Sequence, residues 1–251
     1  GDFDGNDKTI SDLYINRPSS NGSALFNATY QANIHDLTLE NAYISGDSSV
    51  GSIVGGNDGT IDNITVSADI HGNFSVGGIV GSNYGDISNV HMSGDMDISD
   101  ESENMGGIIG TMHGGNLSDC SYSGDMISHT SSGGLVGTVS DSGQHTIDRC
   151  FSEGSITTDS EIVGGIVGTE YTVDLVISNS YSTMDINAEN GWAVGGIVGS
   201  GGTSLVITNS YFNGTVTGDS DVGGIIGYRS PNQVITNSYA TGLVTANSGY
   251  G

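Results

Sequence analysis

The residues best suited to bind a metal ion stand at the N-terminus, where Asp2, Asp4, Asn6 and Asp7 lie close together in the sequence. Oxygen ligands at alternate positions are typical of the first half of a calcium-binding loop. The glycine and the distal glutamate that an EF-hand requires do not follow at their places. We therefore predict no obligatory cofactor, and a Ca²⁺ ion bound by these residues stays an alternative.

The two cysteines, Cys120 and Cys150, occupy equivalent places in two copies of one repeated phrase. If the two copies form neighbouring strands, their Cα atoms would lie about 4.8 Å apart, within the range of a disulfide. An oxidising exterior would favour that bond. The alternative is a stacked pair of buried free thiols that act as small hydrophobic side chains. Neither arrangement predicts catalysis.

Asparagine offers a third kind of chemistry, because the sequon Asn-x-Ser/Thr recurs along the chain and is the acceptor for N-glycosylation. The predicted glycosylation candidates are Asn21, Asn27, Asn73, Asn116 and Asn213. A sixth sequon at Asn63 lies inside a repeated phrase and is the least suited to modification. Chance alone produces several sequons in a chain so rich in Asn, Ser and Thr, so they agree with a glycoprotein without establishing one.

Motifs for enzymatic chemistry are missing from the sequence. The six histidines form no H-E-x-x-H pattern, and the two cysteines do not have the spacing of metal ligands. No G-x-S-x-G elbow with plausible partners occurs. Glycosidases need two carboxylates that converge on one groove, and the many acidic residues of this chain make chance clusters common. We therefore expect a protein that is not an enzyme.

The charge balance is strongly acidic, with 29 Asp and Glu residues, four Lys and Arg residues and a net charge of −25. Repulsion among these charges would destabilise a compact fold at low salt, whereas about 1 M salt screens charges beyond roughly 3 Å. The composition therefore favours a salty medium over the surroundings of an ordinary acidic secreted protein. The scarcity of Lys and Arg argues against nucleic-acid binding, and no apolar run is long enough for a membrane span in this segment.

The elements that position these residues come from a phrase that recurs seven times. It reads VGSIVGG at 50–56 and VGGIVGS at 76–82, and further copies stand at 105–111, 132–138, 163–169, 194–200 and 222–228. A second phrase, such as ISNSYSTMDI from Ile177, follows each copy, and weaker versions of it start at Ile10 and Ile34. A period of about 28 residues indicates one supersecondary unit per copy, stacked on its neighbours.

Each unit contains short apolar runs rich in Ile, Val, Tyr and Thr, separated by Gly, Asn, Asp and Ser, and none has helical periodicity. The sequence therefore predicts an all-β fold, a single-stranded parallel β-helix (β-solenoid) with about eight coils. The right-handed form is expected, because crossovers between parallel strands are right-handed. We expect one domain over 1–251, with degenerate N-terminal coils at 1–49, regular repeats at 50–247 and the start of a further repeat at 248–251. Such a chain would be a fragment of a longer protein.

Equivalent positions of successive copies should form columns along the solenoid. The Ile and Val in the middle of the first phrase, such as Ile79 and Val80, cannot both face inward on a straight strand. Either the chain bends there or something outside the coil covers one column. The second phrase contains an amide column with Asn63, Asn89, Asn179, Asn209 and Asn237. It also contains an aromatic column with His91, Tyr122, Phe151, Tyr181, Tyr211 and Tyr239.

The amide column can hydrogen-bond from coil to coil. Asp119 and Arg149 interrupt it in adjacent coils, where they are well placed to pair with each other. For the aromatic column, stacking that supports the fold is favoured over a strip that binds sugars.

The pairs VGGIVGT…ISNSYS and SGGLVGT…IDRCFS resemble the GLUG repeat, and the opening FDGNDKTISDLYI at 3–15 resembles a start common in bacterial and archaeal surface proteins of this kind. The resemblance covers nearly the whole chain. It implies a β-helical stalk or adhesive region of a large cell-surface protein and no catalytic residues. Some members carry a metallopeptidase domain elsewhere, to which nothing in this sequence corresponds.

The function expected from these patterns is that of a non-catalytic, extracellular structural or adhesive module of a cell-surface or filament-forming protein. Its expected partners are other surface proteins, copies of itself or glycans. Two alternatives stay open. One is a carbohydrate-active β-helix enzyme, either a polysaccharide lyase or a hydrolase, and the other is a viral or appendage fibre subunit.

Overall fold

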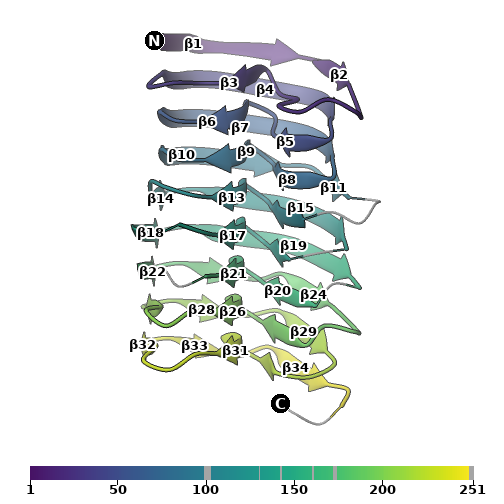
Figure 1. Ribbon diagram of the computed structural model, residues 1–251, viewed down its shortest axis with the longest axis vertical. Helices are drawn as coiled ribbons and strands as arrows, with labels where there is room; N and C mark the ends of the chain where they lie inside the picture. Colours follow the sequence, from purple (N-terminus) through teal and green to yellow (C-terminus); the bar gives the residue numbers. More distant parts are fainter. Residues whose placement is uncertain (99–102, 130, 142, 160, 172–173, 249–251) are drawn as a thin grey trace.

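The computed structural model describes residues 1–98, 103–129, 131–141, 143–159, 161–171 and 174–248. Within these ranges every regular element is a β-strand, and the strands pair in parallel from one coil to the next. The coils stack into a solenoid with the N-terminus at one end and the C-terminus at the other (Figure 1). The predicted parallel β-solenoid is confirmed, and right-handedness stays a prediction. No described helix is long and apolar enough to cross a membrane.

Three parallel sheets run along the solenoid, and we call them the long, the seven-stranded and the eight-stranded sheet. The long sheet contains β1 (Asp2–Ser11), β2 (Tyr14–Asn16), β4 (Asn33–Ser45), β7 (Thr60–His71), β10 (Asp86–Ser93), β11 (Met96–Asp97), β14 (Leu117–Ser118), β15 (Ser121–Ser128), β18 (Gln144–Asp148), β19 (Phe151–Thr158), β22 (Asp174–Ser178), β23 (Tyr181–Ser182), β24 (Asp185–Asn187), β27 (Val206–Thr208), β28 (Tyr211–Phe212), β29 (Thr215–Gly218), β32 (Val234–Thr236), β33 (Tyr239–Ala240) and β34 (Leu243–Ala246). The seven-stranded sheet contains β5 (Ser48–Val50), β8 (Phe74–Gly77), β12 (Glu103–Gly106), β16 (Ser132–Gly133), β20 (Ile162–Gly164), β25 (Ala193–Gly195) and β30 (Val222–Gly223). The eight-stranded sheet contains β3 (Phe26–Ala28), β6 (Val54–Asn57), β9 (Val80–Asn83), β13 (Ile109–Met112), β17 (Val136–Val139), β21 (Val167–Glu170), β26 (Val198–Gly201) and β31 (Ile226–Arg229).

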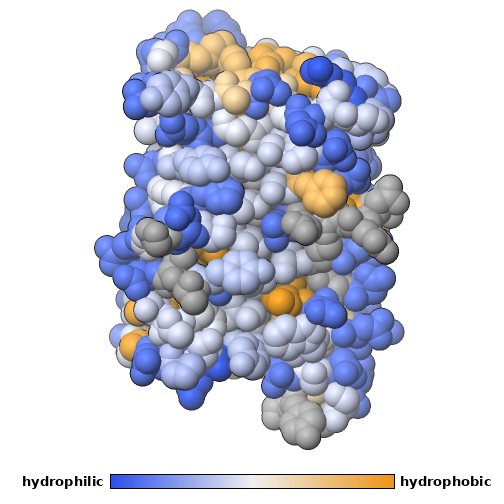
Figure 2. Space-filling view, viewed as in Figure 1, coloured by the Kyte–Doolittle hydropathy of each residue, from blue (hydrophilic) through white to orange (hydrophobic). Residues whose placement is uncertain are grey.

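The apolar columns stack as the repeat predicts. In the long sheet the paired residues, in order, are Ile34, Ile61, Ile87, Leu117, Ile147, Ile177, Ile207 and Ile235. The first phrase stacks in the same way, because Ile79 N–H donates to Ile108 O at 3.1 Å and Ile108 N–H to Leu135 O at 2.9 Å. Except for Ile235 in the last coil, which is exposed, these side chains fill the interior, whereas hydrophilic residues cover most of the face in Figure 2.

A bend in the chain explains how two adjacent apolar residues are both buried. Ile79 and Val80 are each 0% exposed, and they lie where the chain turns from β8 in the seven-stranded sheet to β9 in the eight-stranded sheet. The bend needs glycine, because a Cβ on Gly77 would lie 2.0 Å from Val80 O. Of the two explanations that the sequence allows, the bend is therefore correct.

The amide column has a second physical cause that the sequence pattern did not reveal. Its residues adopt the left-handed backbone conformation in coil after coil, with φ of 52° at Asn63, 55° at Asp119 and 54° at Arg149. Asn and Asp tolerate this conformation better than other side chains. Amide pairing occurs in the last coils, where Asn209 Nδ2 donates to Asn179 Oδ1 at 3.3 Å.

The predicted Asp119–Arg149 pair is confirmed. Arg149 Nε donates to Asp119 Oδ1 at 2.7 Å, and Nη2 donates to Oδ2 at 2.6 Å.

The first coil departs from the register that the repeated phrase suggests. Ile10 and Ile34 both begin versions of the second phrase, yet Phe3 pairs with Ile34, and Ile10 pairs with Leu39. An irregularity between Asp4 and Lys8 inserts extra residues in β1 and shifts the pairing beyond it.

Candidate functional site

A group of ionisable side chains lies at the N-terminal edge of the long sheet, where β1 pairs with β4 and Asp4 stands opposite His35. His35 Nδ1 lies 2.8 Å from Asp36 Oδ2 and 3.9 Å from Asp4 Oδ1, and its Nε2 lies 3.5 Å from Asp2 Oδ1. Ligand atoms of Asp4, His35 and Asp36 all lie within 4.8 Å of one another. A histidine nitrogen with two carboxylates suits a transition metal better than Ca²⁺, which prefers oxygen ligands only.

The structure therefore assembles part of the predicted metal-binding set and adds two residues to it. Asp2 and Asp4 face the new group, whereas Asn6 contributes its backbone N–H, which donates to Asp4 Oδ1 at 2.7 Å. Asp7 is not among the grouped ligands of the described residues. Sequence reasoning missed His35 and Asp36 because they belong to the next coil, and only the pairing of Phe3 with Ile34 would have revealed them. The predicted Ca²⁺ site stays a prediction.

Electrostatics accounts for this group without an added cation. The hydrogen bond that His35 donates to Asp36 raises the pKa of His35, and the charges of Asp4 and Asp2 act in the same direction. Hydrogen bonds from Asn63 and His35 lower the pKa of Asp36. When it is protonated, the imidazole partly neutralises the carboxylates that surround it.

The two cysteines are free and buried, so the structure holds the stacked-thiol arrangement of the two alternatives. Cys120 N–H donates to Cys150 Sγ at 3.4 Å, and in the next coils Cys150 N–H donates to Ser180 Oγ at 3.0 Å and Ser180 N–H to Ser210 Oγ at 3.2 Å. The thiols therefore take the place of hydroxyls in one ladder. Burial raises the pKa of the Cys120 thiol, which suppresses the reactive thiolate. An oxidised form of the pair stays a prediction.

The predicted glycosylation candidates differ in how their amides are engaged. Asn73 Nδ2 donates to Asp47 Oδ1 at 2.9 Å, and Asn116 Nδ2 donates to Asp86 Oδ1 at 3.0 Å. Asn213 is exposed, and its Oδ1 accepts a hydrogen bond from Thr241 at 2.9 Å. Asn21 and Asn27 are also exposed, and Asn27 Nδ2 donates to Asn21 O at 3.2 Å. Modification at all five sites stays a prediction.

The exposed aromatic column forms a stack on the long sheet. Phe151, Tyr181, Tyr211 and Tyr239 follow one another with ring centroids 5.0, 4.9 and 5.4 Å apart and interplanar angles of 9° or less. Within this ladder the ring faces cover each other. A sugar ring could not stack on faces that are already covered, so the geometry agrees with a structural role.

Tyr122 is not a member of this column, which corrects the sequence prediction. It pairs with Ser152 and is fully buried, while Ser121 takes the position next to Phe151. Because side chains alternate between the two faces of a strand, an offset of one residue moves a ring from the surface into the interior. The ring fits beside Gly107, where a Cβ would lie 2.3 Å from it, and burial raises the pKa of Tyr122.

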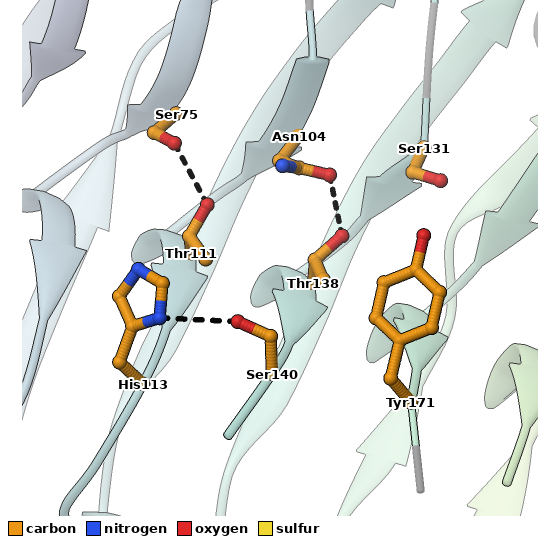
Figure 3. Close-up of a pocket in the computed structure, with 8 residues that line it drawn as sticks. All are labelled: Ser75, Asn104, Thr111, His113, Ser131, Thr138, Ser140 and Tyr171. Carbon is orange, nitrogen blue, oxygen red and sulfur yellow. Dashed lines mark hydrogen bonds between the residues drawn. The ribbon is translucent and has the colours of Figure 1, made fainter.

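A polar groove opens at the bend between the seven-stranded and eight-stranded sheets, and its volume is about 470 Å³. One wall contains Ser75 of β8, Asn104 of β12 and Ser131, which precedes β16. The other wall contains Thr111 of β13 and Thr138 of β17. His113, Ser140 and Tyr171 follow β13, β17 and β21 and lie along one side of the groove (Figure 3).

Hydrogen bonds across the bend fix the walls of this groove. The hydroxyls of Ser75 and Thr111 lie 2.8 Å apart, and Thr138 Oγ1 donates to Asn104 Oδ1. Each bond joins the seven-stranded sheet of one coil to the eight-stranded sheet of the next. Figure 3 shows both bonds, together with the contact of 3.1 Å between Ser140 Oγ and His113 Nδ1.

The lining of the groove carries no acidic side chain, lysine or arginine among the described residues. Burial lowers the pKa of His113, and the charge of Asp141 acts against this shift. The imidazole is therefore neutral near pH 7. Tyr84 stacks on it with centroids 4.7 Å apart, and Tyr171 is 59% exposed. This surface can form hydrogen bonds and pack against rings.

Sequence reasoning missed the groove, because its lining changes from coil to coil. Tyr84, His113, Ser140 and Tyr171 are each the second residue after a copy of the first phrase, and the residue type there changes from each coil to the next. Aligning the residues that follow each phrase would have placed these four in one column.

The fold and its repeated bend define the chain as a parallel β-solenoid built from one supersecondary unit. Residues 72–99 match the GLUG motif. Both phrases of the matched segment recur in the other coils, so the chain contains a GLUG motif and is similar to GLUG-repeat proteins along its length.

Among curated proteins, a segment of 71 residues is 42% identical to halomucin of Haloquadratum walsbyi (strain DSM 16790 / HBSQ001). The matched segment covers 28% of this chain and 1% of halomucin.

Two solved structures share the architecture. An IgA1 protease matches with a TM-score of 0.64 and 18% identity, over 93% of this chain and 20% of that chain. A candidate immunoglobulin A1 protease from Bacteroides ovatus matches with a TM-score of 0.56 and 18% identity, over 96% of this chain and 68% of that chain. At this identity the likeness shows the fold alone.

Proposed function

We propose that this solenoid is a non-catalytic structural module of an extracellular, cell-surface protein, in which it spaces or joins other parts of the surface. The proposal rests on the continuous stack of coils, in which residues at equivalent positions hydrogen-bond or stack from one coil to the next. The ladder that runs from Cys120 through Ser210 and the aromatic stack from Phe151 to Tyr239 both extend over successive coils. Such a rod resists local unfolding because each coil is held on both sides.

Composition and relatives support the same function. A net charge of −25 suits a medium rich in salt, where repulsion along a narrow rod is screened. The GLUG motif and the likeness to halomucin support a surface protein, and adhesion to other surface proteins or to further copies of this chain is part of the proposal.

A β-helix enzyme is the second candidate, because both similar solved structures carry the name of a protease. The groove at the bend argues against glycoside hydrolysis there, since it is lined by neutral hydroxyl, amide and ring groups. Hydrolysis of a glycoside needs a pair of carboxylates flanking the bond.

Cell fractionation and turnover assays test the proposal. Cells that produce the full-length protein are separated into cytosol, envelope and medium, and an antibody against this segment follows the protein. We expect it in the envelope or the medium, and recovery in the cytosol would contradict a surface function. The purified protein is also incubated with casein and with neutral and acidic polysaccharides. New peptide amines or reducing ends would contradict a non-catalytic role.

A further inference from the structure

We propose that the polar groove at the bend binds an uncharged saccharide. This inference goes beyond a structural role, because it assigns a ligand class to one place on the rod. The groove spans the coils from β8 to β21, and its volume of about 470 Å³ lies within the range of small-molecule sites.

Hydrogen-bonding capacity is the first argument. The hydroxyls of Ser75 and Thr111 bond each other at 2.8 Å, and Ser140 bonds His113 at 3.1 Å, so their positions are fixed before a ligand arrives. A hydroxyl that makes one such bond keeps further donor or acceptor capacity. Groups that both donate and accept match the hydroxyls of a sugar, which do the same. Because the lining is already ordered, binding loses little side-chain entropy.

Charge is the second argument. The chain has a net charge of −25, yet the groove is lined by neutral side chains, and burial keeps His113 in its uncharged form near pH 7. An anionic saccharide would be repelled by the surrounding acidic surface. A cation would find no carboxylate in the lining. A neutral ligand with many hydroxyls fits both conditions.

The rings supply the third argument. Figure 3 shows Ser140 between the rings of His113 and Tyr171. Tyr171 is 59% exposed, whereas Tyr181 and Tyr211 on the long sheet are half-buried and carry a stacked ring on each face. The small Ser140 side chain leaves space between the two rings. The apolar C–H face of a pyranose can pack against an exposed tyrosine while its hydroxyls reach Thr138 and Ser140.

Calorimetric titration of the folded chain in concentrated NaCl tests the proposal directly. The probes are tetrasaccharides of glucose, mannose, galactose and N-acetylglucosamine, with tetragalacturonate as the anionic comparison. We expect at least one neutral probe to bind, and the anionic probe to bind more weakly. A neutral ligand exchanges no counterions, so its affinity should stay unchanged when the salt is lowered within the range where the protein stays folded.

Two variants locate the site, and a third serves as a matched control. Tyr171→Ala should weaken binding by about tenfold or more, and Ser140→Tyr should block binding by filling the space between the rings. Tyr30→Ala is the control, since Tyr30 is 76% exposed and follows β3 of the same sheet but does not line the groove. Circular dichroism melting checks that all three variants fold.

Three results would overturn the proposal. One is the absence of binding by every neutral probe, and the second is tighter binding of tetragalacturonate. The third is a folded Tyr171→Ala or Ser140→Tyr variant with the affinity of the unmodified chain.

Discussion

Two of the side-chain columns on this solenoid contain aromatic rings and differ in how completely they are filled. On the long sheet, Phe151, Tyr181, Tyr211 and Tyr239 place one ring in each of four successive coils, and the rings stack with centroids about 5 Å apart. Directly after β9, β13, β17 and β21, the corresponding series is Tyr84, His113, Ser140 and Tyr171. Tyr84 and His113 stack at 4.7 Å, and the series is then interrupted by the small Ser140 side chain.

The difference shows where a repeat protein can acquire a ligand. In a column that repeats one residue type, each side chain contacts the copies above and below it, because the strand spacing brings them within reach. Such columns stabilise the rod, and inside them the ring faces cover one another. A column whose residue changes size from coil to coil leaves a space, and the fixed walls on either side then shape it. Departures from the repeat are therefore the places to look for binding.

The largest expected effect comes from breaking a uniform column in the core. Ile177 of β22 is fully buried between Ile147 and Ile207, so Ile177→Ala removes apolar contacts in three coils at once. We expect a loss of about 2–5 kcal/mol in the free energy of unfolding, measured by urea titration. Ser140→Ala, in the interrupted column, should change it by less than about 0.5 kcal/mol. Equal effects of the two substitutions would mean that the columns do not differ in their structural importance.

A smaller effect should separate the two sets of rings. Tyr211→Ala deletes a ring that stacks on both Tyr181 and Tyr239. Each aromatic pair contributes about 0.5–1.5 kcal/mol beyond area burial, so the variant should lose about 1–3 kcal/mol of stability in the same urea titration. Tyr171→Ala should lose less than about 0.5 kcal/mol. If Tyr171→Ala lost more stability than Tyr211→Ala, Tyr171 would support the fold and would not be a ring left free for a ligand.

Much of the fold was predictable from the sequence, because a parallel solenoid places one residue of each column in every coil. The step from Ile61 to Ile87 and on to Ile177 is visible as text, and so is the coil-to-coil pairing of Asp119 with Arg149. The assignment of Tyr122 to the aromatic column was wrong by a single residue. Alternation of side chains turns that small offset into full burial.

The candidate sites were harder to predict, since they depend on contacts between phrases. The irregularity between Asp4 and Lys8 changes the register of the first coil, and this places Asp4 rather than a later residue beside His35. The groove lies between two sheets that meet at a bend, so Ser75 touches Thr111 of the following coil. Periodicity specifies which residues share a column, but it does not specify which columns face each other across a corner.

The smallest effect concerns two histidines, one in each kind of environment, whose pKa values should move in opposite directions. The hydrogen bond that His35 donates to Asp36 holds the pKa of His35 above 6.5, so its stabilising contribution is complete below pH 6.5 and is lost as the pH rises through the folded-state value. Burial holds the pKa of His113 below 6.5, so protonation of this ring destabilises the fold as the pH falls from 6.5 toward the folded-state value.

NMR titration of the histidine ring protons at constant salt measures both values, and substitution separates their causes. Asp36→Asn should bring the pKa of His35 back toward 6.5 and leave that of His113 unchanged, because Asp36 lies in the first coils and Asp141 is the charge that acts on His113. A shift of both histidines in the same direction would contradict the contrast between a charged strand edge and a neutral groove. Because only desolvation lowers the pKa of His113, an unshifted value would mean that water fills the groove around the ring.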